Sequence, residues 1–336
     1  MKLYKIFILL FLVSITAKSQ QLPMYSQFLT NSFAYNPAVT GSDNFSAIRL
    51  TSRMQWIGIK DAPKTTTLSM HSRIGRTNFY NNTGRVRNTT KFNKKGDVVK
   101  TKKISFKGQE AIGAMIFTDK NGPFTRSGIL LTGAYHFEFK RFRNRKNQAT
   151  KFAVGLGLSL FQFRLNEEDF QPFTIDDQAL TYGIESSMIP DLNLGFYFYN
   201  SEYFIGYSIA NMIEAKVKLG GNHYGVNEIV KHNYLSAGYK YNIKRDLDIQ
   251  SSILIKSTSY SASQVDFNIK MFLKKIQFGL SYRNNGDLAS IFSIKYGLYF
   301  FGYSYDFSFK NMTSYSFGTH EIVLGYNLEE SLFRGK

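Results

Sequence analysis

The sequence predicts an all-β protein, namely a transmembrane antiparallel up-and-down β-barrel of about fourteen strands. Three observations predict this class. Apolar and polar residues alternate along many segments, several segments reach nine to twelve residues, and short connections alternate with long ones. A tilted strand needs roughly 9–11 residues to cross a bilayer, whereas a strand of a soluble protein usually has about five or six. The barrel is expected to span residues 44–333.

The alternation has a period of two residues, which places successive side chains on opposite faces of a strand. Residues 299–309 carry Tyr or Phe at every odd position, residues 264–273 carry apolar residues at odd positions, and residues 152–160 carry them at even positions. The apolar faces are expected to contact lipid, with aromatic residues near the strand ends. A soluble β-sandwich would alternate too, but the segment lengths favour the barrel. The polar residues expected to face the lumen are Asp248, Gln250, Asp266, Asn268, Lys270, Gln277, Arg283, Asp306 and Glu321.

The connections predict how the barrel is oriented in the membrane. Tight links are expected at 200–202, 242–246, 274–275 and 297–298, and longer ones at 57–63, 119–128, 164–190, 212–231, 257–263 and 310–318. In outer-membrane barrels the short turns are periplasmic and the longer loops are extracellular. An even number of strands closes the sheet, so that no strand edge is left unpaired in the membrane.

The N-terminus has the pattern of a secretory signal peptide over residues 1–19. A basic start, MKLYK, precedes the apolar run IFILLFLVSI, and Ala17-Lys18-Ser19 supplies small residues before the expected cleavage site. The chain has no cysteine, which excludes disulfides, thiolate metal ligands and a lipid-anchored cysteine. Residues 20–43 show little alternation and are expected to form either a disordered lead-in or a periplasmic or plug-like segment.

Positive charge is concentrated in two segments of a chain with formal net charge +18. Residues 76–107 contain ten basic residues and one acidic residue, and residues 139–151 contain six basic residues and no acidic one. Both segments are expected on the periplasmic side, where 76–107 is either a solvated turn or a docking site for an acidic protein partner or anionic lipid. The candidate docking residues are Arg85, Arg87, Lys94, Lys95, Lys102, Lys103, Arg141, Arg143 and Arg145.

The sequence contains no motif that predicts catalysis, a cofactor or a metal site. Its five histidines lack paired ligand spacing. The predicted loop 164–191 contains seven acidic residues that offer oxygen ligands for Ca²⁺, yet their spacing favours a solvated surface loop. Glu321 is expected to join a hydrogen-bond network in the lumen rather than to act in catalysis.

Several short motifs resemble those of one known family. Asn36-Pro37-Ala38 with Gly41 follows the block Ser26-Gln27-Phe28, and Arg53-Met54-Gln55-Trp56 with Gly58 precedes Pro63-Lys64-Thr65. Segments 119–128, 302–306 and 318–326 match further blocks, while the insertion 76–107 departs from the family pattern. On these motifs the chain resembles the PorP/SprF family of type IX secretion system outer-membrane proteins of Bacteroidetes. The candidate partner-binding or motif residues are Asn36, Pro37, Gly41, Arg53, Gln55, Trp56, Gly58, Pro63, Tyr303, Asp306, His320 and Glu321.

The resemblance implies a non-enzymatic outer-membrane component of type IX secretion, often found in gliding bacteria. Such a component supports secretion or surface attachment of an adhesin-like cargo protein and links to periplasmic machinery. A passive porin and a surface barrel that binds through its outer loops are the alternatives. Trp56, the only tryptophan, is expected either at the membrane–water interface or in contact with a partner. The expected partners are secretion components, a cargo protein and outer-membrane lipid, and not nucleic acid.

Overall fold

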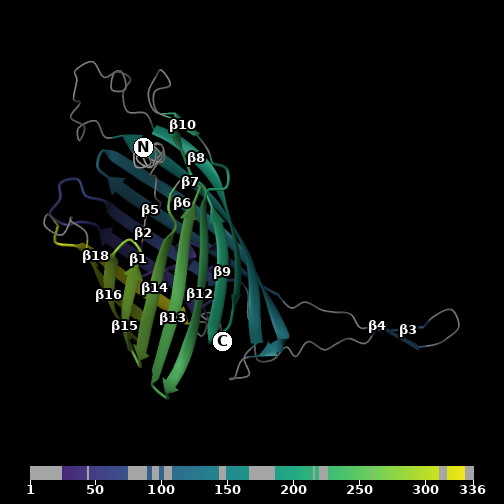
Figure 1. The fold of residues 1–336 in the computed structure, drawn as a ribbon. Helices are drawn as coiled ribbons and strands as arrows, with labels where there is room; N and C mark the ends of the chain where they lie inside the picture. The colour runs from purple at the N-terminus through teal and green to yellow at the C-terminus, as the bar shows by residue number, and fades with distance from the viewer. Residues whose placement is uncertain are drawn as a thin grey trace, which may run out of the picture.

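The described strands form a closed antiparallel barrel of fourteen members (Figure 1). The structure is a computed structural model, and it describes residues 25–43, 45–74, 89–92, 98–101, 108–143, 149–165, 186–214, 216–218, 226–259, 261–309 and 316–329. The barrel strands are β1 (Phe45–Met54), β2 (Lys64–Arg73), β5 (Gly108–Asn121), β6 (Phe124–Arg143), β7 (Ala149–Leu165), β8 (Ser186–Tyr199), β9 (Tyr203–Ala210), β12 (His232–Lys244), β13 (Leu247–Thr258), β14 (Gln264–Leu273), β15 (Ile276–Arg283), β16 (Asp287–Tyr296), β17 (Tyr299–Ser308) and β18 (Thr319–Glu329). This architecture confirms the predicted fold class.

The barrel closes between its last strand and its first. β18 pairs with β1 over the whole of β1, from Phe45 opposite Glu329 to Met54 opposite His320. Two small two-stranded sheets stand outside this ring, β3 (Thr89–Phe92) with β4 (Val98–Thr101) and β10 (Lys216–Lys218) with β11 (Val226–Glu228). β3 and β4 belong to the predicted basic insertion, whose other residues lie outside the described ones.

The two ends of the barrel carry different connections, and we name the ends after them. The loop end carries the connections 55–63, 211–231 and 309–318, and the turn end carries 200–202, 245–246, 274–275 and 297–298.

The predicted long connection at 119–128 is wrong, because a tight hairpin lies there. β5 and β6 pair up to Asn121 opposite Phe124, so that only Gly122 and Pro123 connect them. Gly122 has φ +58°, a left-handed conformation that lets two residues reverse the chain. A three-residue turn at 284–286 is likewise short although it lies at the loop end. Loop length therefore alternates less regularly than predicted.

The two faces of the barrel wall follow the predicted alternation. In β7, Leu156 and Leu158 are both 62% exposed, whereas Ala153 is fully buried. In β14, Phe267 and Ile269 are exposed between buried polar neighbours. Since the exposed side chains are apolar, the outer surface suits contact with lipid tails, and the polar residues line the lumen. Among the described residues, no helix has the length and apolar character needed to cross a membrane.

Residues 25–43, which we call the lumen segment, fill part of the barrel interior. The segment contains the short 3₁₀ helices η1 (Ser32–Ala34) and η2 (Pro37–Val39). Phe33 packs in an apolar cluster with the lumen-facing Met115 and Phe161, and Tyr35 packs against Tyr234 on β12. The segment is thus packed against the inner wall at several heights. Residues 1–24, which include the predicted signal peptide, lie outside the described residues.

Candidate functional site

The first contact of the lumen segment is with charged residues near the loop end. The Ser26 hydroxyl donates to Asp306 Oδ2 at 2.5 Å and accepts a hydrogen bond from Arg53 Nη1. The backbone amides of Ser26 and Gln27 donate to the two Glu321 carboxylate oxygens at 2.8 and 3.1 Å. Arg283 Nη2 of β15 also donates to the Ser26 hydroxyl, at 3.0 Å. One serine and one backbone turn therefore occupy the centre of a set of wall residues that come from β1, β15, β17 and β18.

These wall residues belong to a buried ionic network with matched charges. Arg53 pairs with Asp306 at 2.9 Å and with Glu321 at 3.2 Å. Arg283 pairs with Asp306 at 3.1 Å, and Lys256 pairs with Asp266 at 2.9 Å. Each of these six side chains is at most 9% exposed. Three cations thus face three carboxylates, as buried charges require.

A second contact lies at Asn36, Pro37 and Ala38. Asn36 caps η2, since its Oδ1 accepts from the Ala38 amide at 2.9 Å, and its Nδ2 donates to the Phe196 carbonyl of β8 at 3.0 Å. Pro37 stands at the first position of η2, where its missing amide proton costs nothing. The motif therefore forms one polar turn that is fixed to the wall by a single side chain.

Glycines on the wall make room for this turn. A Cβ atom on Gly155 of β7 would lie 2.3 Å from the Ala38 nitrogen, and one on Gly195 of β8 would lie 2.1 Å from Asn36 Oδ1. Such distances do not occur between real atoms, so a side chain at either position would displace the turn or the strand. The close approach of segment and wall depends on these two glycines.

The third contact lies toward the turn end. Gly41, with φ +71°, donates its amide to His71 Nδ1 at 3.2 Å and accepts from Arg73 Nε at 2.7 Å. Thr40 is linked through its carbonyl to His136 Nε2 at 2.7 Å. Because His71 Nδ1 is an acceptor here, its Nε2 carries the proton and faces Asp43 at 3.9 Å. The lumen segment is therefore hydrogen-bonded along its length.

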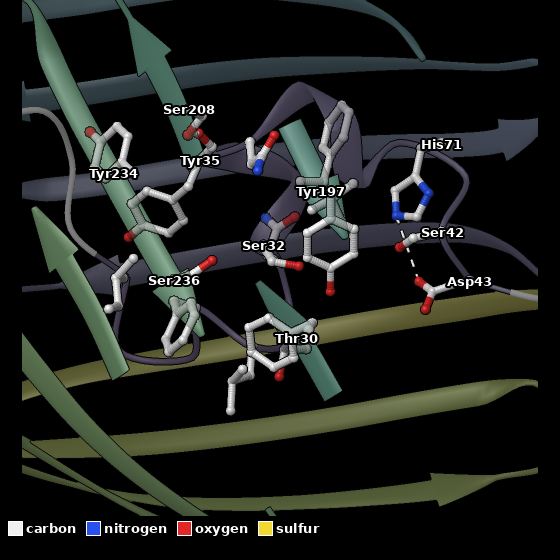
Figure 2. Close-up of a pocket in the computed structure, with 18 of the residues that line it drawn as sticks. Thr30, Ser32, Tyr35, Ser42, Asp43, His71, Tyr197, Ser208, Tyr234 and Ser236 are labelled. Carbon is white, nitrogen blue, oxygen red and sulfur yellow. Dashed lines mark hydrogen bonds and ion pairs between the residues drawn. The ribbon is translucent and has the colours of Figure 1, made fainter. Parts of the chain in front are cut away.

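A cavity of about 150 Å³ remains between the lumen segment and the wall (Figure 2). Figure 2 shows Thr30 and Ser32 of the segment on one side, with Tyr197, Ser208 and Tyr234 of the wall around them. Gln250 of β13 also lines the cavity. Burial raises the pKa of the phenol of Tyr35, which also lines the cavity, so that this group stays a neutral hydrogen-bonding group.

A separate group of motif residues builds the hairpin between β1 and β2 at the loop end. The Gln55 amide donates to the Pro63 carbonyl at 2.9 Å, and the Trp56 amide donates to Thr319 Oγ1 at 3.2 Å. Trp56 has φ +47° and Gly58 has φ +102°, so both take left-handed conformations in the reversal of the chain. Trp56 is half-buried in this rim and lies outside the lumen network.

Tyr303 and His320 form a third group on the outer face of the wall. The Tyr303 hydroxyl and His320 Nδ1 are 2.8 Å apart. His320 and Glu321 are adjacent in β18 and therefore point to opposite faces. The structure thus distributes the motif residues among the lumen network, the turn at Asn36 and Gly41, the loop-end rim and the outer face.

A family model described as "Type IX secretion system membrane protein PorP/SprF" matches residues 17–326. The chain belongs to this family. It is therefore a membrane component of type IX secretion, as the motifs predicted. No curated protein sequence matches the chain.

Three solved barrels of other kinds are similar to this PorP/SprF protein at low identity. The TodX deltaS2S3 mutant monoaromatic hydrocarbon channel has a TM-score of 0.44 and 7% identity, with 89% of this chain and 94% of that chain covered. The translocator domain of the autotransporter NalP from Neisseria meningitidis has a TM-score of 0.38 and 6% identity, with 86% and 90% covered. Outer membrane protein Omp33 of Acinetobacter baumannii has a TM-score of 0.37 and 8% identity, with 85% and 97% covered.

The candidate docking residues of this family member lie mostly outside the described part of the chain. This holds for Arg85, Arg87, Lys94, Lys95, Lys102, Lys103 and Arg145, and for the side chains of Arg141 and Arg143. Among the described residues, no three His, Cys, Asp or Glu side chains are grouped as metal ligands would be.

One acidic residue of the predicted surface loop is placed differently from the expectation. Asp191 lies in β8, is 1% exposed, and accepts from the amides of Leu192 and Ile213 at 2.6 and 3.1 Å. The expectation of a solvated loop residue is wrong here, because β8 begins at Ser186 and turns Asp191 toward the lumen.

Neither the alternation nor the motifs identify all the residues that position the lumen segment. Ser26 belongs to a motif block, yet nothing in the alternation marks it as the partner of charged wall residues. Gly155 and Gly195 were visible as small residues on lumen faces. Their role follows only from the long-range contact with Asn36 and Ala38.

Proposed function

We propose that this PorP/SprF protein is a non-enzymatic outer-membrane component of type IX secretion that supports secretion or surface attachment of an adhesin-like cargo. The observation that carries the proposal is the family match over residues 17–326. The apolar outer face and closed ring of strands support an integral position in the outer membrane. In this position the loop end faces the outside and the turn end faces the periplasm.

The lumen contacts support a secretion component over a passive porin. An open porin needs a continuous aqueous path, whereas here the lumen segment bonds to the wall at Ser26, Asn36 and Gly41. We therefore assign the segment the role of a plug in the resting barrel. A solute pore would require its displacement.

The proposal also gives roles to the residues outside the lumen. The rim around Trp56 would contact lipid headgroups or a partner at the outside. The basic insertion 76–107 and the residues near Arg143 would dock on an acidic periplasmic partner, which is the link to the rest of the machinery. Such docking would weaken as salt is raised.

The test compares secreted and surface-exposed proteins of the parent strain, a deletion strain and the deletion strain complemented with the gene. Loss of one or a few large surface proteins, restored on complementation, is the expected result for a cargo-specific component. Loss of many secreted proteins would place the chain in the core of the machinery. An unchanged surface proteome, together with single-channel conductance of the purified barrel in a planar bilayer, would overturn the proposal in favour of the porin.

A further inference from the structure

Lys270 of β14 is a buried cation whose ammonium group has no anionic partner among the described residues. Its side chain faces the lumen and is 7% exposed. The ammonium group makes no hydrogen bond or ion pair with any residue that the structure describes, and its Nζ lies 5.4 Å from the centroid of the Phe272 ring. An ammonium group withdrawn from water costs several kcal/mol unless an anion or acceptor compensates it, roughly as for other buried ions.

Two further cations add to the positive charge around Lys270. Lys240 of β12 lies against the same ring at 4.4 Å and pairs with Asp248 at 3.0 Å. Arg49 of β1 is 7% exposed and donates to the Ile48 carbonyl at 2.9 Å and to Asn327 Oδ1 at 2.6 Å, which are both uncharged acceptors. Among the described residues, Arg49 and Lys240 both repel Lys270, and the carboxylates that act on these two cations are Asp43 and Asp248.

The lining of the cavity beside the lumen segment does not include these three cations, but it includes a strand neighbour of two of them. Gln250, which lines the cavity, lies directly opposite Lys240 on one side and Lys270 on the other. Asp43 supplies a carboxylate to the cavity lining, and its Oδ2 lies 3.9 Å from His71 Nε2. A volume of about 150 Å³ holds several water molecules or one small ion. It does not admit a folded partner.

We propose that Lys270, Lys240 and Arg49 bind a small, multiply charged oxyanion of the phosphate class inside the turn-end half of the lumen. Lysine ammonium groups act as point charges for such ions, and the burial of Lys270 and Arg49 weakens the screening of their charges by water. The ion comes from solution as a free phosphate compound or from a phospholipid headgroup, both of which present the same phosphoryl oxygens. The proposal does not depend on the role in secretion.

The experiment uses the full-length protein purified in a zwitterionic detergent and titrated calorimetrically with inorganic pyrophosphate at constant ionic strength. The expected result is saturable binding with one ion per chain, weakened at least tenfold by Lys270→Gln. The matched control is Lys274→Gln, which removes the same charge at the same end of the barrel from a side chain that is 70% exposed. This control should bind as the parent does.

Each further arm either supports or overturns the proposal. Lys240→Gln should also weaken binding, and it carries the test if Lys270→Gln does not give a folded barrel by circular dichroism. Displacement of pyrophosphate by phosphatidylglycerol in mixed micelles would assign the site to a lipid headgroup, and the lack of displacement would assign it to a free phosphate compound. Equal binding by parent and Lys270→Gln, or binding of an oligoglutamate peptide in place of pyrophosphate, would overturn the proposal.

Discussion

The two halves of the lumen differ in whether their buried charged side chains are paired with opposite charges. In the half toward the loop end, Arg53, Arg283 and Lys256 are matched by three carboxylates, and the lumen segment adds Ser26 to the network. In the half toward the turn end, Arg49 and Lys270 have no carboxylate bound to them among the described residues. The comparison teaches that a polar lumen face predicted from alternation contains two kinds of site. In one kind, carboxylates of the chain pair with every cation. In the other, cations of the chain lack a bound carboxylate, which leaves them available to an anion.

The largest effect on stability is expected from disrupting the paired ionic network near the loop end. Arg53→Met leaves Asp306 and Glu321 buried with less positive charge, which should lower the free energy of unfolding by about 3–5 kcal/mol. Urea titration of the detergent-solubilised barrel measures this loss. The control Lys274→Met breaks an exposed pair with Asp246 and should cost less than about 1 kcal/mol. Equal losses in the two variants would show that the network does not hold the fold.

A steric change should separate the lumen segment from the wall with a smaller loss of stability. Gly195→Ala places a Cβ atom where Asn36 Oδ1 now lies, and overpacking of this kind costs about 1–3 kcal/mol. We expect faster proteolysis within residues 25–43 and a rise in bilayer conductance.

The matched control for this change is Gly133→Ala on β6, where the added Cβ atom meets nothing within 4 Å. Parent-like conductance and proteolysis are expected for that control. If Gly195→Ala behaved in the same way, the turn at Asn36 would not close the lumen.

Removal of the Ser26 hydroxyl tests how much the lumen segment adds to the stability of the ionic network near the loop end. Ser26→Ala leaves the ion pairs intact but takes away one donor to Asp306 and the acceptor shared by Arg53 and Arg283. A loss of about 1–2 kcal/mol is expected, in line with hydrogen bonds to charged groups. Ser26→Thr keeps the hydroxyl and should recover part of the loss. If Ser26→Ala had the same free energy of unfolding as the parent, the ion pairs alone would account for the stability of this network.

The smallest structural effect is expected at the loop-end rim. Because Trp56 is the only tryptophan, its fluorescence reports directly on its surroundings. Brominated lipids should quench it in reconstituted membranes if the indole lies at headgroup level. Trp56→Phe should leave the free energy of unfolding within about 0.5 kcal/mol of the parent value. Absence of quenching, together with impaired cargo secretion in Trp56→Phe, would favour the partner contact instead.

The sequence could predict the barrel because strand period and strand length are local properties. It could also predict that Arg53, Asp306 and Glu321 share the lumen face or a family motif. It could not predict that they meet at Ser26, since this depends on register between the first strand and the last two. The tight turn at Gly122 cannot be predicted for a related reason, because the pairing between β5 and β6 extends into residues whose composition is typical of a loop.

The seam between β1 and β18 has a consequence for biogenesis. Ser26 bonds to Asp306 and Glu321, which are 280 and 295 positions later in the chain. These partners come together only when the final hairpin of β17 and β18 joins the first strand. Contacts of such high sequence separation form late in folding. The N-terminal residues must therefore remain unbonded and able to bind until β17 and β18 have folded and β18 has paired with β1.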